Sequence, residues 1–138
     1  MIVLDTNIVS NVMQDVSEPR VLAWLNALST ESVWTTAITV FEVRLGLCLL
    51  PSGKRRRELE EGFTRALDVV LGGKVLSFDQ AAGDFAGTLA ATAKRTGQNI
   101  EVRDVQIAGI VASRRATLAT RNVRHFAPLG LTVVNPWA

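Results

Sequence analysis

Hydrophobic residues open the chain as an unbroken run, Ile2 to Leu4, which ends abruptly at the acidic Asp5. Consecutive aliphatic residues are typical of a strand buried on both faces of a parallel sheet, whereas a strand with one solvated face alternates. Four further segments have the composition of short strands and are bounded by polar or turn residues. These predicted strands lie at residues 32–35, 75–76, 116–120 and 131–134.

Between the predicted strands, apolar residues recur three and four positions apart, which is the spacing of a helix with one buried face. Segment 37–50 is apolar nearly all round and stops before Pro51, so we expect a largely buried helix. Asp79 and Asp104 are placed to cap two later helices. The remaining helices are predicted at residues 8–13, 18–28, 54–71, 79–96 and 104–115, with a loop or short helix at 121–126.

Strands that alternate with helices from end to end predict an α/β fold, a three-layer α/β/α arrangement around a mostly parallel central sheet. With 138 residues and 48% hydrophobic content, residues 1–138 suffice for a single domain with a full core. The lone Cys48 lies among leucines, so we expect a buried, inert thiol and a reducing, cytoplasmic location. We expect no signal peptide and no membrane span, because charges interrupt every apolar stretch.

The net charge of +2, from 15 basic and 13 acidic residues, neither requires nor excludes nucleic acid. Only residues 54–61 form a dense charge run, in which Lys54, Arg55, Arg56 and Arg57 precede three glutamates. Several opposite charges lie four residues apart, as in ion pairs on one helix face. A solvated helix face is therefore favoured over a nucleic-acid patch.

Asp5 has two interpretations, because it follows a buried strand and precedes an apolar helical segment. As a helix N-cap it would accept a backbone N–H hydrogen bond. As a site residue it would lie at the carboxyl end of a parallel strand, where ligands of open α/β sheets bind. The sequence around Asp5 alone favours neither interpretation.

Three other polar residues carry the same kind of ambiguity. Glu42 lies on an apolar helix face, where a carboxylate is costly unless an arginine such as Arg44, or a bound cation, pairs with it. Asp104 either caps its helix or, still ionised, serves as a ligand for a hard metal ion. Asn122 follows a predicted strand and either stabilises a turn or reaches the same sheet edge as Asp5.

Together, Asp5, Glu42, Asp104 and Asn122 offer only oxygen ligands, which suit Mg²⁺, or Mn²⁺ in its place, rather than zinc or copper. Empty clustered carboxylates repel one another, so a divalent cation would hold them ionised. The reaction that fits such a cation is attack of activated water on a phosphodiester. Three arginines flank these acids in the sequence and are candidates for holding a nucleic-acid backbone: Arg103, Arg121 and Arg124.

Other catalytic classes lack their residues. Neither common glycine-rich phosphate-binding motif occurs. Asp5 is not followed two residues later by the second acid that an aspartyl-phosphate hydrolase would need. His125 is the sole histidine, which excludes a two-histidine ribonuclease; we expect it on a partly exposed loop, with substrate binding near Asn122 as the alternative.

Four blocks, in order along the chain, resemble the PIN-domain endoribonucleases, specifically the VapC-like toxins of type II toxin–antitoxin systems in the branch that includes FitB. The blocks are residues 2–7 (IVLDTN), 37–46 (AITVFEVRLG), 104–108 (DVQIA), and 119–122 (ATRN) with 135–137 (NPW). The resemblance implies a Mg²⁺- or Mn²⁺-dependent ribonuclease, a homodimer or higher assembly, and a separate DNA-binding antitoxin as partner.

The resemblance also implies roles for individual residues. Asp5, Glu42 and Asp104 match the three principal acids, and Thr6, Asn7 and Thr120 match the small polar residues that support them. Many relatives carry a fourth acid where this chain has Asn122, and some carry another where it has His125. We therefore expect one well-occupied cation site, and keep open a catalytically weakened binding protein or a nuclease for another substrate.

Overall fold

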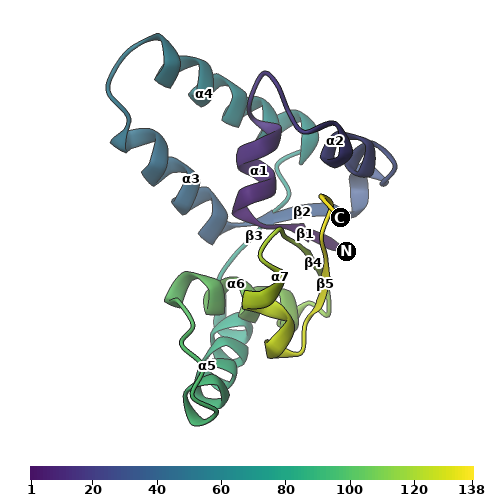
Figure 1. Cartoon of the computed structure of the whole chain (residues 1–138), viewed down its shortest axis with the longest axis vertical. Coiled ribbons are helices and arrows are strands. Elements are labelled where there is room, and N and C mark those ends of the chain that lie inside the picture. Colours follow the sequence, from purple (N-terminus) through teal and green to yellow (C-terminus); the bar gives the residue numbers. More distant parts are fainter.

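The computed structural model describes residues 1–138 and confirms the predicted three-layer fold. All strands of the central sheet run parallel, in the order β3-β2-β1-β4-β5 (Figure 1). In register, Leu4 of β1 lies beside Ala119 of β4, so the residues after these two strands meet at one edge. The strands are β1 (Ile2–Leu4), β2 (Val33–Thr36), β3 (Val75–Leu76), β4 (Thr117–Ala119) and β5 (Thr132–Val134).

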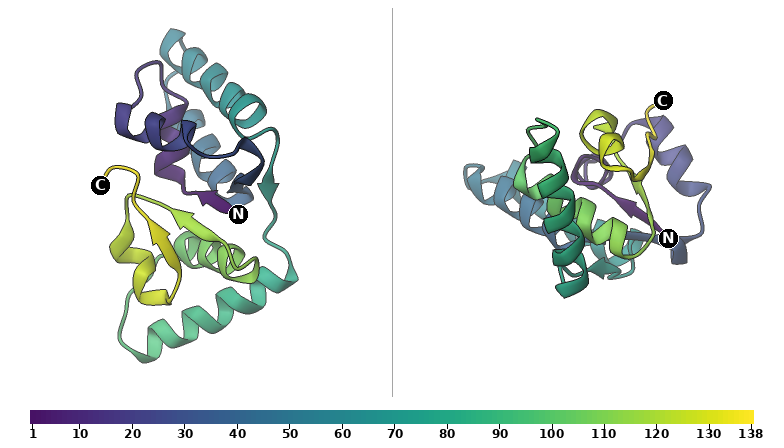
Figure 2. Two further views of the ribbon diagram at one scale, coloured as in Figure 1. Left: turned by 90° about the vertical axis from the view of Figure 1, so that its right-hand side faces the viewer. Right: turned by 90° about the horizontal axis from the view of Figure 1, so that it is seen from below.

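Helices cover both faces of the sheet. Figures 1 and 2 show α1 to α4 on one side and α5, α6 and α7 on the other. A π-helical segment, Ala66–Val70, extends α4. The helices are α1 (Thr6–Val12), α2 (Pro19–Asn26), α3 (Ala37–Leu49), α4 (Lys54–Arg65), α5 (Gln80–Arg95), α6 (Val102–Ser113) and α7 (Val123–Phe126), with short 3-10 turns at Thr30–Ser32 and Ala127–Leu129.

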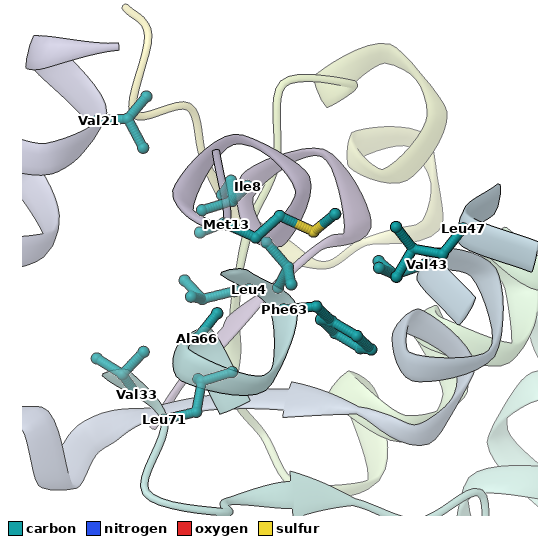
Figure 3. Packing of buried hydrophobic residues seen from close by; sticks show 12 residues of the cluster. Leu4, Ile8, Met13, Val21, Val33, Val43, Leu47, Phe63, Ala66 and Leu71 are labelled. Carbon is teal, nitrogen blue, oxygen red and sulfur yellow. The ribbon is translucent and has the colours of Figure 1, made fainter. Parts of the chain in front are cut away.

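The hydrophobic core has one cluster on each face of the sheet. Figure 3 shows the first cluster, in which Leu4 of β1, Ile8 of α1 and Phe63 of α4 pack together. The second lies between the sheet and α5 and α6, where Gly109 allows a close approach because any Cβ there would clash with Ala82 of α5. The alternation of apolar segments that predicted the fold thus corresponds to two real packing layers.

The prediction that segment 37–50 is largely buried is wrong. One stripe of α3 packs inward, including Val43 and Leu47, whereas Phe41 is 55% and Leu49 77% exposed. Cys48 is likewise exposed, not buried as predicted. A helix that lies on a sheet can bury only one face in its own chain, and apolar residues on the other faces therefore remain uncovered.

Two helix starts can be compared with their predictions. Asp79 caps α5 as predicted, with its side chain accepting a hydrogen bond from the Ala82 N–H. Asp104 does not cap α6, because that helix begins at Val102 and Asp104 lies within its first turn. The Asp104 carboxylate is therefore free of a backbone cap. No helix reaches the length and hydrophobicity needed to cross a bilayer.

Candidate functional site

Asp5 lies directly after the last residue of β1 and is the N-cap of α1. The Thr6 N–H donates to Asp5 Oδ1 at 2.8 Å, so the predicted N-cap is confirmed. The Thr120 hydroxyl donates to Oδ2 at 2.6 Å, and the Asn7 amide lies 3.4 Å from the same oxygen. With only 4% of the residue exposed, this carboxylate is buried and fixed in orientation by donors on both oxygens.

Thr120 connects Asp5 to the loop after β4. It follows β4, the neighbour of β1, and is fully buried. Its hydroxyl accepts hydrogen bonds from the Asn122 N–H at 3.0 Å and the Asn7 amide at 3.3 Å. The side-chain oxygen Oδ1 of Asn7 in turn accepts a hydrogen bond from the Arg121 N–H at 3.2 Å. The loop after β4 is therefore tied to the start of α1 through polar side chains.

Glu42 reaches the same edge from α3. The Thr6 hydroxyl donates to Glu42 Oε1 at 2.9 Å, and Arg103 Nη1 of α6 lies 3.8 Å from Oε2. Arg44, the sequence neighbour considered as a partner, instead pairs with Glu60 at 3.4 Å. An arginine therefore does face Glu42, but it comes from the helix on the opposite side of the sheet.

Two threonines below Glu42 were not among the predicted site residues. Thr36 caps α3 by accepting from the Thr39 N–H at 3.1 Å, and both residues are fully buried. The Thr39 hydroxyl lies 3.2 Å from that of Thr6, which holds Glu42. One feature of the sequence could have indicated this chain of hydroxyls from Thr36 to Glu42. Thr39 lies three residues before Glu42 on a mostly apolar helix, where a buried hydroxyl needs a hydrogen-bond partner.

Asp104 and His125 form a pair that the sequence did not predict. His125 Nδ1 lies 3.2 Å from Asp104 Oδ2, and the histidine side chain is 58% exposed. His125 lies in α7 rather than in a loop, and its partial exposure is as predicted. Asn122 immediately precedes α7 with an exposed side chain that makes no capping hydrogen bond.

The three carboxyl groups influence one another. Burial is the main cause that raises the pKa of Asp5, of Glu42 and of Asp104 above their ordinary values. Repulsion adds to each shift: Asp104 acts on Asp5, Asp5 on Glu42, and Glu42 on Asp104. Hydrogen bonds from Thr120 and Thr6 oppose the shifts at Asp5, and the hydroxyl of Thr6 opposes it at Glu42. Loss of a proton from each of the three groups is therefore less favourable than it is in water.

The three candidate RNA-binding arginines occupy different environments. Arg103 lies between Glu42 and Glu101, with its Nε 2.9 Å from Glu101 Oε1. The Arg121 guanidinium stacks 5.0 Å from the ring centroid of Trp137. Arg124 is exposed and lines a cavity that also includes Asp104. Of the three, Arg124 alone forms neither an ion pair nor an aromatic contact, and it shares a cavity with the acidic Asp104.

The oxygen donors at this edge have the chemistry of a site for a divalent cation. Asp5, Glu42 and Asp104 offer carboxylate oxygens only, and threonine hydroxyls surround two of them, as Mg²⁺ or Mn²⁺ prefers. No three acidic, histidine or cysteine side chains lie close enough to hold one ion as they stand. The chemistry of the donors fits, and side-chain rotation of Glu42 or Asp104 would be needed to complete the ligand set.

Comparison with known proteins agrees with this geometry. Residues 2–128 match the PIN domain family. The chain is 38% identical to VapC ribonuclease Y4jK of Sinorhizobium fredii, with 99% of this chain and 98% of that protein covered. It is 36% identical to Toxin FitB of Neisseria gonorrhoeae, with 99% of each covered. The structure of FitAB bound to an IR36 DNA fragment matches with a TM-score of 0.89 at 36% identity, covering 100% of this chain and 96% of that one. The predicted resemblance is confirmed, and the chain belongs to the PIN domain family, among the VapC-like and FitB-like toxins of toxin–antitoxin systems.

Proposed function

We propose that this protein is a Mg²⁺-dependent endoribonuclease that acts as the toxin of a type II toxin–antitoxin pair. The observation that carries the proposal is the buried Asp5 carboxylate, oriented by Thr120 at the carboxyl edge of the sheet. Repulsion from Asp104 helps raise the pKa of Asp5, and Thr6 donates hydrogen bonds to both Asp5 and Glu42. The ribonuclease name of the relative from Sinorhizobium fredii supports the substrate class.

In this proposal Asp5, Glu42 and Asp104 would hold the cation, which when bound would supply Lewis-acid chemistry for attack of water on a phosphodiester. The Thr120 and Thr6 hydroxyls keep a carboxylate oxygen of Asp5 and of Glu42 in place. Thr6 and Asn7 also fix the turn from β1 into α1. Arg103 and Arg124 supply positive charge for the RNA backbone at the border of the acids.

The test is cleavage of a labelled single-stranded RNA by the purified protein. We expect cleavage with Mg²⁺, loss of cleavage when a chelator removes the metal, and recovery when Mn²⁺ is added in excess. A matched preparation incubated with chelator and refilled with Ca²⁺ controls for simple stabilisation of the fold. Cleavage that persists in chelator would contradict the proposal.

The number of cations is a separate part of the proposal. Asn122 is neutral and His125 pairs with Asp104, so this part of the edge has less negative charge than four or five acids would supply. We propose one tightly held cation. Anomalous scattering from crystals soaked in Mn²⁺ should show one fully occupied position, and two fully occupied positions would contradict this part of the proposal.

The partners follow from the same family. FitAB and VapBC structures are complexes of a toxin with its antitoxin, some bound to DNA. We propose that this chain likewise binds a small DNA-binding antitoxin and forms a homodimer. The exposed apolar residues Phe41, Leu45 and Leu49 on α3 support an interface of some kind. Co-expression with the product of the adjacent reading frame, followed by light scattering, measures both associations.

A second candidate function is binding without useful catalysis. Asn122 and His125 favour it, because each replaces an acid that some relatives carry. Its signature would be RNA and antitoxin binding of normal strength with turnover near background in Mg²⁺ and Mn²⁺. Turnover that depends on Asp5 would exclude it.

A further inference from the structure

A polar cavity of about 350 Å³ opens beside Asp104. Its lining comes from residues 98–101, which lead into α6, from Asp104 of α6, and from Arg124, His125 and Pro128, in and after α7. These two helices contact each other on the same side of the sheet (Figure 1). Asp104 and His125 form the wall that the cavity shares with the acidic edge. Anything bound in the cavity therefore lies next to a proposed cation ligand.

One wall of the cavity can stack against a flat ring. His125 exposes most of its imidazole, and its Nδ1 contact with Asp104 at 3.2 Å limits rotation of the ring. Ile100 is the hydrophobic member of the lining, and Pro128 adds further apolar surface. Proteins that bind single-stranded RNA commonly stack unpaired bases on aromatic side chains, histidine included.

Another part of the lining carries groups that read hydrogen-bonding edges. Gln98 and Asn99 both line the cavity with exposed side chains, and each amide offers donors and an acceptor. Their turn is held in place because Gly97 adopts a φ of 74° and the Gln98 N–H donates to the Ala93 carbonyl at 2.8 Å. The two amides are therefore presented from a defined loop.

The charges of the lining favour a neutral base over an anionic phosphate as the group bound in the cavity. Glu101 and Asp104 are acidic, and Arg124 is the one basic residue among the lining side chains. An anionic phosphate inside the cavity would be repelled by the two carboxylates, whereas a neutral base would not. Arg124 can instead contact the phosphate that follows the bound base.

We propose that this cavity, the base pocket, binds one unpaired nucleobase of the RNA beside the bond to be cut and so sets the sequence preference of cleavage. The inference rests on the proposed ribonuclease function. A stacking ring, apolar surface and two amides are the groups from which base-reading sites are built. The volume of the cavity is sufficient for one base and its sugar.

The test measures binding separately from cleavage. The full chain carrying Asp5→Asn is titrated with RNA octamers made only of A, only of C, only of U, or of alternating G and U. We expect the amide resonances of residues 98–101 and 124–125 to shift, and the strongest and weakest octamers to differ at least about fivefold in Kd. Adding Gln98→Ala and Asn99→Ala together should reduce that difference to less than about twofold.

Gln80→Ala is the matched control, because Gln80 is an exposed amide at the other end of α5, about 24 Å away along the helix. It should retain the full difference among octamers, and thermal unfolding checks that every variant folds. Equal Kd values for all octamers would overturn the base pocket, as would discrimination that survives loss of both amides.

Cleavage mapping with the Asp5-containing protein separates the two proposals. Metal-dependent cleavage with random bases beside the cut would overturn the base pocket and leave the ribonuclease proposal standing. Octamer discrimination that depends on Gln98 and Asn99, in a protein that never cleaves RNA, would support the base pocket and refute the ribonuclease. Cleavage with one preferred base, relaxed in the double-alanine variant, supports both.

Discussion

Asp5 and Asp104 lie at the same edge of the sheet but are held in different ways. Both oxygens of Asp5 accept hydrogen bonds, from Thr6 and from Thr120, and the residue is 4% exposed. Asp104 contacts only His125, whose side chain is largely in solvent. One carboxylate is therefore fixed by the folded chain, whereas the other is held by a single exposed contact.

This difference follows from where each residue comes from. Asp5 and Thr120 follow adjacent parallel strands, so sheet hydrogen bonding alone brings them together. Asp104 lies in the first turn of α6, and His125 in the four-residue α7. The hydrogen bond between Thr120 and Asp5 can therefore form as soon as β1 and β4 pair. On the Asp104 side, by contrast, the pair depends on how two helices pack, and no three acidic, histidine or cysteine side chains of the chain are grouped to hold an ion.

The largest expected effect comes from removing charge on the fixed side. Asp5→Asn should lower metal-dependent cleavage on the order of a thousandfold, because an essential anionic ligand is lost. The fold should survive, because asparagine caps a helix about as well as aspartate and still offers an oxygen to the Thr6 N–H. Single-turnover cleavage and thermal unfolding measure the two effects.

Asp15→Asn is the control for Asp5→Asn, because Asp15 is an exposed aspartate in the turn after α1. It should change neither activity nor unfolding. An Asp5→Asn protein that fails to fold would show that the Asp5 carboxylate is needed mainly for the fold, and the metal role would lose its support.

A smaller loss should follow from loosening Asp5 without changing its charge. Thr120→Val keeps the shape of a fully buried side chain but removes the 2.6 Å hydrogen bond to Asp5. We expect a loss of about 10- to 100-fold in activity or Mn²⁺ affinity, the range seen for residues that orient metal ligands. The free energy of unfolding should fall by about 1–3 kcal/mol, since the Asn122 N–H loses its acceptor.

Thr120→Ser separates the hydroxyl from the rest of the side chain and should recover most of the activity lost in Thr120→Val. Recovery of stability without recovery of Mn²⁺ affinity would show that the hydroxyl of residue 120 stabilises the fold but does not orient Asp5 for a cation. The fixed side of the edge would then be no better organised for a cation than the Asp104 side.

The sequence predicted the fixed side better than the Asp104 side. Asp5 is predicted at the carboxyl edge because parallel strands end together, the family resemblance adds Asn7 and Thr120, and the structure places the three in contact. The parallel sheet and the two layers of helices also follow the alternating pattern, whereas the strand order does not. On the other side, Arg103 contacts Glu42 and His125 contacts Asp104, and each pair comes from segments far apart in the sequence. Local periodicity does not specify how α6 and α7 pack against the rest of the fold.

The exposed face of α3 shows a second limit of the hydrophobic pattern. An apolar residue such as Leu49 favours burial, but the pattern does not state whether its own chain or another molecule provides the cover. Cys48 was misplaced for the same reason, since it shares that uncovered side of the helix. The charge run, by contrast, follows the local rule: Lys54 pairs with Glu58 and Arg56 with Glu60, each four residues on.

The raised pKa values of Asp5, Glu42 and Asp104 predict how pH should act on both sides of the edge. Without metal, the folded state binds these protons more tightly than the unfolded chain does. Their contribution to the free energy of unfolding therefore grows as pH falls through the raised pKa values, and it declines toward neutral pH. Mn²⁺ affinity should change in the opposite direction, by up to about tenfold per pH unit for each proton displaced.

Thermal unfolding with and without Mn²⁺, from pH 5 to pH 7.5, measures both trends. The stabilisation by Mn²⁺ should be larger at pH 7.5 than at pH 5, and Asp5→Asn should reduce that difference. Equal stabilisation at both pH values would mean that the cation does not compete with protons on these carboxylates, and the proposed ligand set would be wrong.

The smallest expected effect distinguishes the arginines beside the two sides of the edge. Arg121 is held by its stacking on Trp137, whereas Arg124 is exposed beside Asp104. Arg124→Ala should weaken RNA binding most at low salt and lower the slope of log K against log salt by about 0.7, the value for one contact to single-stranded RNA. Arg121→Ala should instead reduce the free energy of unfolding by about 0.5–1 kcal/mol with the salt slope unchanged. The opposite result would be a smaller slope of log K against log salt in Arg121→Ala and an unchanged slope in Arg124→Ala. It would place the RNA backbone on the Asp5 side of the edge, and the Asp104 side would then bind the cation alone.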